Sequence, residues 1–451
     1  MDRALAVASA ALIIALIGFG AIYAGITSLK TQLEEANNRI ANLQNEVKAL
    51  KEASSGYAST TQLEDVRSAL QEISGDIKSI QSKIEKAATQ GDVQEIALQV
   101  ASLQERLAAL EKLASEELKG QIEELTTRLD ELQAEVQELS ARIKFPVVVT
   151  DATGEQVFIA SEPERIVSLA PAVTETLYFI GALDKLVGVD EYSNYPPVVA
   201  EMVENGTIKT IGGFWNPSIE EILSLEPDLV IGVDAPPHKQ VKEVLRDYGI
   251  PVIILPQNSI DDVKRSIIIT GMATGNMEQA IDVLGKLSRT LAQVKTMADS
   301  IDGKVKVALI VWVNPIFVAG NDTFQNDIIE FAGGINAFAN LTGWPVVSAE
   351  DLLAAKPDVI ILSRINVTDF LNILVGQLGD SALEIPAVAN KRIYTITGDY
   401  ADMLSRPSPR IAQIIPLIQY ILYPHLYGST PGDIPQTISP ETMPETPQPQ
   451  A

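Results

Sequence analysis

The 451-residue sequence contains no cysteine and only two histidines, and aromatic residues make up 5% of it. Without cysteine the chain can form no disulfide, hold no Cys-ligated metal and offer no thiol nucleophile. His238 and His425 are far apart, and the chain has neither a G-x-S-x-G motif nor a phosphate-binding loop motif, so no nucleophile with a neighbouring base is visible. We therefore do not expect an enzyme.

Positive charge is also scarce, because 34 Lys and Arg stand against 59 Asp and Glu, which gives a net charge of −25. A nucleic-acid-binding protein needs a basic surface to meet phosphates, so we expect no nucleic-acid partner. The acidic balance fits a soluble surface that resists self-association.

The N-terminal region carries a long apolar run, from residue 4 to residue 26, that contains no charged residue. As a helix this run would cover roughly 34 Å, enough to cross a bilayer. A cleaved signal peptide is the alternative, but its apolar run would be shorter and "IYAG" is a poor cleavage site. We predict a transmembrane anchor over 1–27, the expected tether because no cysteine is available for lipidation.

A heptad pattern follows over 28–144. Its apolar residues alternate steps of four and three, as in the run Leu29, Leu33, Ala36, Ile40, Leu43, Val47 and Leu50. Repeated over many heptads, this pattern predicts a coiled-coil stalk. Either identical chains pair or trimerise along it, or the segment folds back on itself near residues 54–60 or 88–92.

At Phe145-Pro146 the apolar period changes. Short β-branched runs such as "DLVIGV" and "DVIILS" alternate with helical stretches, which is typical of parallel sheets in α/β proteins. We predict a binding domain over 145–427, in which one long helix over 276–302 joins an N-lobe (145–275) to a C-lobe (303–427). The Pro/Thr-rich tail, 428–451, is expected to be disordered.

Two stretches of this domain, "SIEEILSLEPDLVIG" (218–232) and "SAEDLLAAKPDVIIL" (348–362), align without a gap. Each predicts a short helix, a Pro-Asp turn and a buried strand. Each helix should begin with a capping box, formed by Ser218 with Glu221 and by Ser348 with Asp351.

Glu220 and Glu350 are not required by this scaffold. Each lies in the first helical turn, where a glutamate points outward and is favoured by the helix dipole. From the spacing alone, each residue is either a dipole-compensating surface group or a functional one.

Aromatic residues cluster just before the two stretches and near the ends of predicted strands: Phe214 and Trp215 in "GGFWNPS", Trp344 in "LTGWPVVS" and Tyr192 in "EYSNYPP". Gly, Asn and Pro around them indicate loops, and α/β sheets bind ligands in loops at strand ends. We therefore predict that these side chains line a ligand site.

From residue 146 to 425 the sequence resembles the class III substrate-binding proteins of ABC importers, in which a rigid helix joins two lobes. Members bind corrinoids, ferric siderophores or haem. The resemblance is carried, in family order, by "RIVSLAPAVTETLYFIGALDKLVGV", "YSNYPP", "IGGFWNPSIEEILSLEPDLVIG", "FVAGNDTFQNDIIEFAGGINAF", "WPVVSAEDLLAAKPDVIIL" and "SPRI". The sequence is most similar to cobalamin-binding members, through "YSNYPP" and "WPVVS".

The resemblance implies an α/β fold of two Rossmann-like lobes joined by one long helix, here preceded by the transmembrane helix and the coiled-coil stalk. It implies ligand binding between the lobes, with little domain closure. By the resemblance, the ligand would contact Tyr192, Phe214, Phe317 and Trp344 through aromatic rings and Asp399 and Arg406 through polar groups; Trp215 is added from the aromatic cluster described above. Glu220 and Glu350 match the glutamates that dock on the two permease subunits.

We therefore expect a membrane-tethered extracellular or periplasmic receptor. It would capture a corrinoid or another large metal chelate and deliver it to an ABC permease dimer with its ATPase subunits. No enzymatic cofactor or resident metal is expected. The alternatives are a ferric-siderophore or haem binder of the same class, a direct metal-ion binder, and a stalked surface sensor or structural protein.

Overall fold

The computed structural model describes residues 98–99, 101–103, 144–299, 301 and 303–443. The expected anchor, nearly all of the expected stalk and residues 444–451 lie outside these ranges. Among the helices that are described, none combines the length and the apolar character needed to span a bilayer.

The chain divides into two units by its internal packing. The first unit consists of 1–150, 156–163 and 268–292. In it, β1 (Val147–Thr150) pairs antiparallel with β2 (Gln156–Ile159). The unit also includes the C-terminal part of α9 (Ile260–Thr274) and most of α10 (Met277–Asp299). Gly271 lets these two helices approach closely, because a Cβ there would lie 2.4 Å from the Cβ of Ala280.

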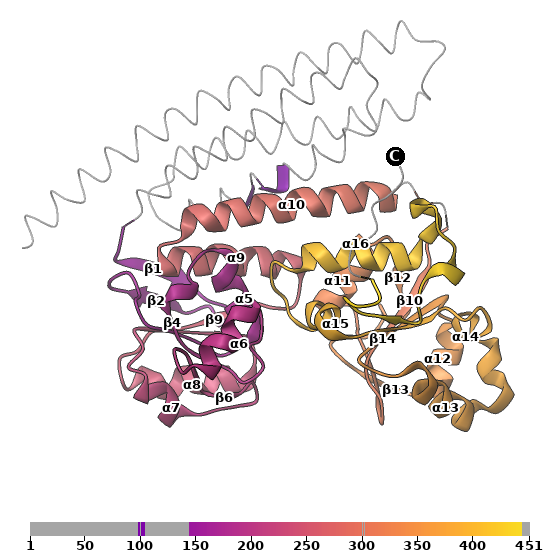
Figure 1. The fold of residues 1–451 in the computed structure, drawn as a ribbon, viewed down its shortest axis with the longest axis horizontal. Helices are drawn as coiled ribbons and strands as arrows, with labels where there is room; N and C mark the ends of the chain where they lie inside the picture. The colour runs from indigo at the N-terminus through magenta and orange to yellow at the C-terminus, as the bar shows by residue number, and fades with distance from the viewer. Residues whose placement is uncertain (1–97, 100, 104–143, 300, 302, 444–451) are drawn as a thin grey trace, which may run out of the picture. The chain divides into compact units, whose positions relative to one another are not determined.

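The second unit, 151–155 with 164–267 and 293–451, contains both large sheets (Figure 1). The first sheet has the order β5-β4-β3-β8-β9, and its strands are all parallel. They are β3 (Ile166–Ser168), β4 (Leu186–Val189), β5 (Lys209–Thr210), β8 (Leu229–Val233) and β9 (Val252–Leu255). With α5 (Pro171–Phe179), α6 (Pro197–Glu204), α7 (Ile219–Ser224), α8 (Pro236–Arg246) and the small hairpin of β6 (Gly212–Gly213) and β7 (Asn216–Pro217), they form the first lobe.

The second lobe is built on a mixed sheet. β10 (Lys306–Trp312), β14 (Val359–Ser363) and β15 (Ile393–Ile396) are parallel, while β11 (Ile316–Val318) and β13 (Val346–Val347) extend the sheet antiparallel beyond β10. β12 (Ile335–Asn336) also pairs with β10. The helices are α11 (Phe324–Phe331), α12 (Ala349–Ala355), α13 (Val367–Leu378), α14 (Pro386–Ala389), α15 (Gly398–Ser405) and α16 (Ile411–Leu422).

These elements confirm the expected α/β architecture, and α10 lies where one long helix was expected. The predicted disorder of 428–451 is wrong for its described part. β16 (Thr437–Ile438) pairs in parallel with β15 at the edge of the second sheet. The Pro/Thr-rich composition suggested disorder, but Ile434 and Ile438 supply apolar side chains that are 5% and 0% exposed.

The two aligned stretches fold alike, as α7 with β8 and α12 with β14, and each helix begins at its serine. Ser348 forms the complete capping box: its Oγ accepts from Asp351 N–H (3.1 Å) and its N–H donates to Asp351 Oδ2 (2.8 Å). Only one of the two hydrogen bonds of the capping box predicted at Ser218 forms. Ser218 Oγ accepts from Glu221 N–H, but the N–H of Ser218 donates to Ile211 O (2.7 Å) and is therefore not free for Glu221.

Candidate ligand-binding site

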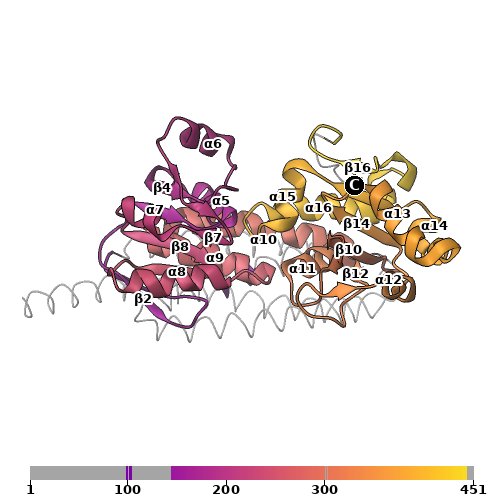
Figure 2. The same cartoon turned by 90° about the horizontal axis from the view of Figure 1, so that it is seen from below.

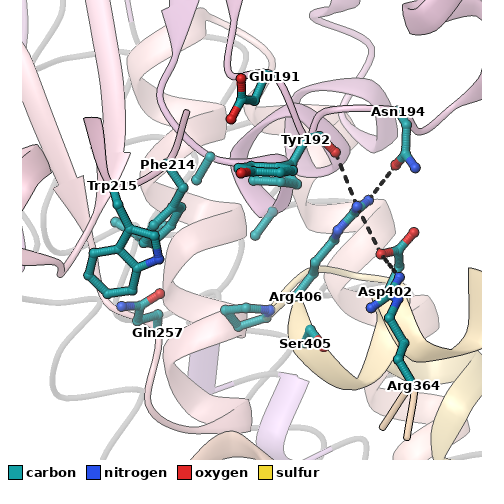
Figure 3. A pocket seen from close by; sticks show the side chains of 15 residues that line it. Glu191, Tyr192, Asn194, Phe214, Trp215, Gln257, Arg364, Asp402, Ser405 and Arg406 are labelled. Atoms are coloured by element: carbon teal, nitrogen blue, oxygen red, sulfur yellow. Dashed lines mark hydrogen bonds and ion pairs between the residues drawn. The ribbon is translucent and has the colours of Figure 1, made fainter. Parts of the chain in front are cut away.

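A cavity of about 690 Å³ lies between the two lobes, at the carboxyl ends of strands from both sheets (Figure 3). Its lining follows β3, β4, β8 and β9 in the first lobe and β14 and β15 in the second: Ala170, Pro171, Ala172, Glu191, Tyr192, Asn194, Phe214, Trp215, Val233, Gln257, Arg364, Asp402, Ser405, Arg406 and Pro407. In open α/β sheets this edge is where ligands bind, and the volume is in the range of small-molecule sites.

Aromatic side chains form one wall of the cavity. Trp215 is 72% exposed and Tyr192 is 54% exposed, which is unusual for residues of this size. Trp215 packs edge-to-face against Phe214, with ring centroids 5.0 Å apart. Both are carried by the β6–β7 hairpin, so a short, tight turn presents two rings to the cavity. This wall offers a broad apolar face to a large ligand.

His238 holds the Phe214 end of this wall in place. It is fully buried in α8, and its Nδ1 accepts the N–H of Val233 at 3.1 Å. Its Nε2 therefore carries the proton and donates to Phe214 O, also at 3.1 Å. Burial lowers the pKa of His238 to about 4, so the ring stays neutral at ordinary pH. Sequence reasoning missed this role, although His238 follows soon after a buried strand.

The loop that carries Tyr192 is fixed by Asp190, which is 1% exposed. Its carboxylate accepts from Ser193 Oγ and from the N–H of Tyr192, the latter at 3.1 Å. Burial raises the pKa of Asp190 to about 6, against the lowering effect of these two bonds. A buried acid thus sets the conformation of the loop beside the cavity.

Arginine and aspartate side chains form the opposite, polar wall (Figure 3). Asp402, on α15, accepts from Arg364 Nη2 at 2.5 Å and from Arg406 Nη2 at 2.9 Å. Arg406 is buried and also donates to Asn194 Oδ1 (2.7 Å) and to Tyr192 O (3.1 Å). Arg364, in contrast, keeps 49% of its side chain exposed and faces the cavity with remaining donors.

A buried ion cluster behind this wall joins the lobes. Glu175, on α5 and 0% exposed, accepts from Arg406 Nη1 (2.9 Å) and Arg410 Nη1 (3.2 Å) through Oε1, and from Ser408 Oγ through Oε2. The donors lie on the segment between α15 and α16, and α5 and α15 are adjacent in both views (Figure 1 and Figure 2). Buried charges tolerate little displacement, because separating them leaves an unpaired ion.

Four of the predicted ligand residues line the cavity: Tyr192, Phe214, Trp215 and Arg406. The other three do not. Asp399 bonds to Arg410 instead, because it lies on the first turn of α15. Phe317 lies on β11, in the antiparallel extension of the second sheet, and stands opposite Trp312 in register, while Trp344 lies in the loop two residues before β13.

Sequence reasoning also missed several residues. These are Glu191, Asn194, Gln257, Arg364, Asp402 and Ser405, which line the cavity, and Glu175, which lies behind it. Glu175 had a signal, as the one acidic residue of the otherwise uncharged helix "PAVTETLYF". Arg364 had another, as the first charged residue after the buried strand β14.

The two predicted docking residues lie on the surface of separate lobes. Glu220 and Glu350 are exposed in the first turns of α7 and α12. Neither lines the cavity. As for metals, the described part of the chain contains no group of three or more His, Cys, Asp or Glu side chains placed to hold an ion.

Comparison with known sequences finds relatives that are described as substrate-binding or vitamin B12-binding proteins. A relative in Bacillus subtilis, the ABC transporter substrate-binding lipoprotein YvrC, described as uncharacterized, is 29% identical over 289 residues, covering 63% of this chain and 87% of its own. A vitamin B12-binding protein of Vibrio parahaemolyticus is 27% identical over 57% of this chain and 89% of its own.

Among solved structures, a solute-binding protein has a similar fold. A possible iron-binding, periplasmic solute-binding protein of Staphylococcus epidermidis matches with a TM-score of 0.51 and 28% identity, over 58% of this chain and all of its own. The family model named "Periplasmic binding protein" matches residues 166–400, which include the first sheet, the second sheet except β16, and most of the cavity lining. The chain belongs to the periplasmic binding protein family.

Proposed function

We propose that this chain is a membrane-tethered substrate-binding protein of an ABC importer that captures a corrinoid or a similarly large metal chelate. Membership in a family of binding proteins makes it a carrier and not an enzyme. The observation that carries the proposal is the cavity itself, which sets exposed Trp215 and Tyr192 against the half-exposed guanidinium of Arg364. A ligand with a broad apolar face and polar substituents at its edge matches that arrangement.

The protein side chains at the cavity favour a chelate that already satisfies its metal. Both nitrogens of His238 are engaged with backbone groups, so this imidazole is not free to bind iron, and His425 is not among the residues that line the cavity. The hydrogen bond and charge of Glu191 raise the pKa of Tyr192, which keeps the phenol protonated and a poor metal ligand. These features favour a corrinoid or a ferric siderophore over a haem that needs an axial ligand from the protein. The B12-binding relative supports the corrinoid choice.

Titration of the purified full chain with cobalamin, cobinamide, haem and a ferric hydroxamate siderophore tests the ligand. We expect cobalamin or cobinamide to bind with a 1:1 calorimetric stoichiometry. Trp215→Ala should weaken that binding by about 2 kcal/mol, or roughly thirtyfold, because buried aromatic contacts dominate such sites. Tyr248→Ala is the matched control, because this ring is also largely exposed but lies outside the cavity. Absence of binding to all four compounds would refute the ligand proposal.

Delivery to the permease is assigned to Glu220 and Glu350. Each is an exposed carboxylate on one lobe, so a permease of two similar subunits could hold both through arginine. We expect the double variant Glu220→Ala/Glu350→Ala to lose uptake in cells while its ligand affinity stays unchanged. The control replaces an exposed acid of each lobe elsewhere, Glu201→Ala/Glu384→Ala. Normal uptake by the docking variant would rule the assignment out.

Tethering is assigned to the predicted transmembrane segment, 1–27, and spacing or oligomerisation to the predicted coiled coil, 28–144. None of the 451 residues is a cysteine, so none can carry a lipid on sulfur. Deletion of 1–27 should release the protein from the membrane fraction. A stalked surface sensor is the alternative, and it predicts that no permease and ATPase genes adjoin this gene.

A further inference from the structure

Residues 429–443 form an ordered segment, named here the C-terminal strap, where the sequence predicted disorder. The strap begins with a capping box between Thr430 and Asp433. It buries Ile434 (5% exposed) and Ile438 (0%), and it ends with Met443, which is 9% exposed. A segment with this much buried apolar surface is held by the lobe and is not a solvated tail.

The strap forms backbone hydrogen bonds at the junction between β15 and α15. Gln436 O accepts the N–H of Thr395 at 2.7 Å, and Ile438 O accepts the N–H of Thr397 at 2.9 Å. Thr397 is the residue that precedes α15, and its side chain makes no capping bond to the helix. The backbone at the start of α15 is therefore fixed from outside, by β16.

Two further contacts reach α15 itself. The hydroxyl of Tyr400 donates to Met443 O at 2.7 Å, so the end of the strap is bonded to the first turn of the helix. Gly398, at a φ of 58°, allows Pro440 to approach so closely that a Cβ there would lie 3.3 Å from Pro440 Cδ. The strap thus contacts α15 along its first turn as well as at the preceding residue.

The other end of α15 forms the polar wall of the cavity. Asp402 and Ser405 line the cavity from the helix, and Arg406 follows directly. Asp402 in turn holds the half-exposed Arg364. A displacement of α15 would move these groups together, because the helix is eight residues long and carries both its strap contacts and its cavity residues.

We propose that the C-terminal strap is a positioning element for the ligand site: by holding the start of α15 it keeps Asp402, Arg406 and, through Asp402, Arg364 in their binding arrangement. Without the strap, α15 is in that arrangement for a smaller fraction of the time. Apparent affinity falls by the same factor, since only the competent fraction binds. The affinity part rests on the proposed function, whereas the effect on α15 does not.

The first test compares two truncations of the full chain. Removal of 429–451 deletes the strap, and removal of 444–451 leaves it intact as the matched control. We expect amide hydrogen exchange over residues 399–406 to be at least about tenfold faster in the first variant, with exchange in β8 and α8 of the first lobe unchanged. Unchanged exchange over 399–406 would overturn the proposal.

The second test uses single residues of β16 in the otherwise complete chain. Ile438→Asp places a charge at a fully buried site, whereas Thr437→Asp places it at the exposed neighbouring site. We expect Ile438→Asp alone to reproduce the faster exchange and to raise the Kd for the bound chelate about tenfold. A synthetic peptide of residues 429–443, added to the strapless chain, should restore both quantities.

The outcomes separate the two proposals. If the full chain binds none of the four compounds, the ligand proposal fails, while exchange over 399–406 and its rescue by the peptide still decide the role of the strap. If exchange becomes faster and the Kd is unchanged, the strap stabilises α15 without positioning the ligand site, and the proposal is wrong. A general loss of structure would instead speed exchange in both lobes and would also contradict it.

Discussion

The two lobes contain the same helix–turn–strand unit, and the residue before the proline has nearly the same φ in both. The residue before the proline adopts a left-handed conformation in each copy, Glu226 at a φ of 45° and Lys356 at 47°. The aspartate after the proline then accepts a backbone N–H from the start of the neighbouring strand segment. Asp228 accepts from Glu164 and Arg165, and Asp358 accepts from Lys306.

The lobes differ in how the surrounding chain uses that unit. In the first lobe, Ile211 takes the N–H of Ser218, and the capping box is left incomplete. In the second lobe the N–H of Ser348 is free to complete it. The second lobe also supplies Arg406, Ser408 and Arg410, whereas the first supplies the carboxylate that they bind. The shared sequence pattern therefore allows the same capping hydrogen bonds in both lobes, and the neighbouring backbone determines which of them form.

The largest expected effect comes from removing the carboxylate of Glu175, which the first lobe supplies to the buried arginines of the second lobe. Glu175→Ala leaves Arg406 and Arg410 buried with fewer anions, and truncation of a buried ion pair costs about 3–5 kcal/mol. We expect the free energy of unfolding in urea to fall by that amount. Glu191→Ala, an exposed glutamate of the same lobe, should change it by less than about 0.5 kcal/mol.

A small loss in the Glu175 variant would mean that the second lobe holds its own cations. Asp399 and Asp402 would then suffice for Arg410 and Arg406, respectively. Glu175→Gln separates charge from hydrogen bonding, because it keeps an acceptor and removes the negative charge. We expect its loss to lie between those of Ala and the unchanged chain.

The second prediction concerns pH, since the first lobe carries both Asp190 and His238. The pKa of folded Asp190, about 6, lies above its unfolded value near 3.8, so ionisation costs stability as the pH rises between these values. His238 acts in the opposite direction over nearly the same range. Its folded pKa, about 4, lies below 6.5, so its contribution is lost as the pH falls from 6.5 to 4.

Asp190→Asn should separate these opposing contributions. A shift of this size corresponds to about 3 kcal/mol, so the stability of the variant relative to the unchanged chain should drop by about that much between pH 7 and pH 4. The variant then retains the acid-sensitive His238 without the compensating Asp190. Urea unfolding of both proteins at several pH values measures the difference. A constant difference would show that Asp190 does not titrate in this range.

The sequence predicted the alternation of strands and helices, the long helix and the paired serine caps, because local periodicity and capping residues indicate each of these features. It also predicted the aromatic wall, since Phe214 and Trp215 stand out against a chain poor in aromatics. It placed Asp399 in the ligand site in place of Asp402. Both residues lie on one face of α15, but Asp399 is in the first turn and bonds to Arg410, whereas Asp402 is nearly one turn further along and bonds to Arg364 and Arg406. Without the helix boundary and these long-range partners, the choice between them cannot be made from the sequence.

Contacts between residues that are far apart in the sequence are the main features that the sequence did not predict. Glu175 and Arg406 are 231 residues apart, and no local pattern joins them. The strap was missed for a related reason: its composition is typical of disorder, and its order depends on the free edge of β15. The incomplete box at Ser218 depends on Ile211, which lies outside the repeated pattern.

The third prediction compares the two caps directly. Ser348→Ala removes the two hydrogen bonds of the Ser348 hydroxyl, from Asp351 N–H and to Asp351 Oδ2, and should cost about 1–2 kcal/mol of unfolding free energy, whereas Ser218→Ala removes only the bond from Glu221 N–H and should cost about 0.5–1 kcal/mol. Asp351→Ala should cost about 1 kcal/mol and Glu221→Ala less than about 0.5 kcal/mol, because only the aspartate returns a bond to its serine. Equal losses at the two serines would show that the hydroxyl bond from Ser348 to Asp351 contributes nothing, and equal losses at Asp351 and Glu221 would show the same for the backbone half of the box.

The smallest effect should be equal in the two lobes. Glu226→Gly and Lys356→Gly remove the side chain from a left-handed residue, which relieves about 1 kcal/mol of strain. The gain is offset by the greater freedom of glycine in the unfolded chain, so we expect each variant to be more stable by about 0–1 kcal/mol. Urea unfolding of the two variants side by side measures this. A gain in one lobe with a loss in the other would mean that one side chain, and not the shared backbone turn, determines the conformation there.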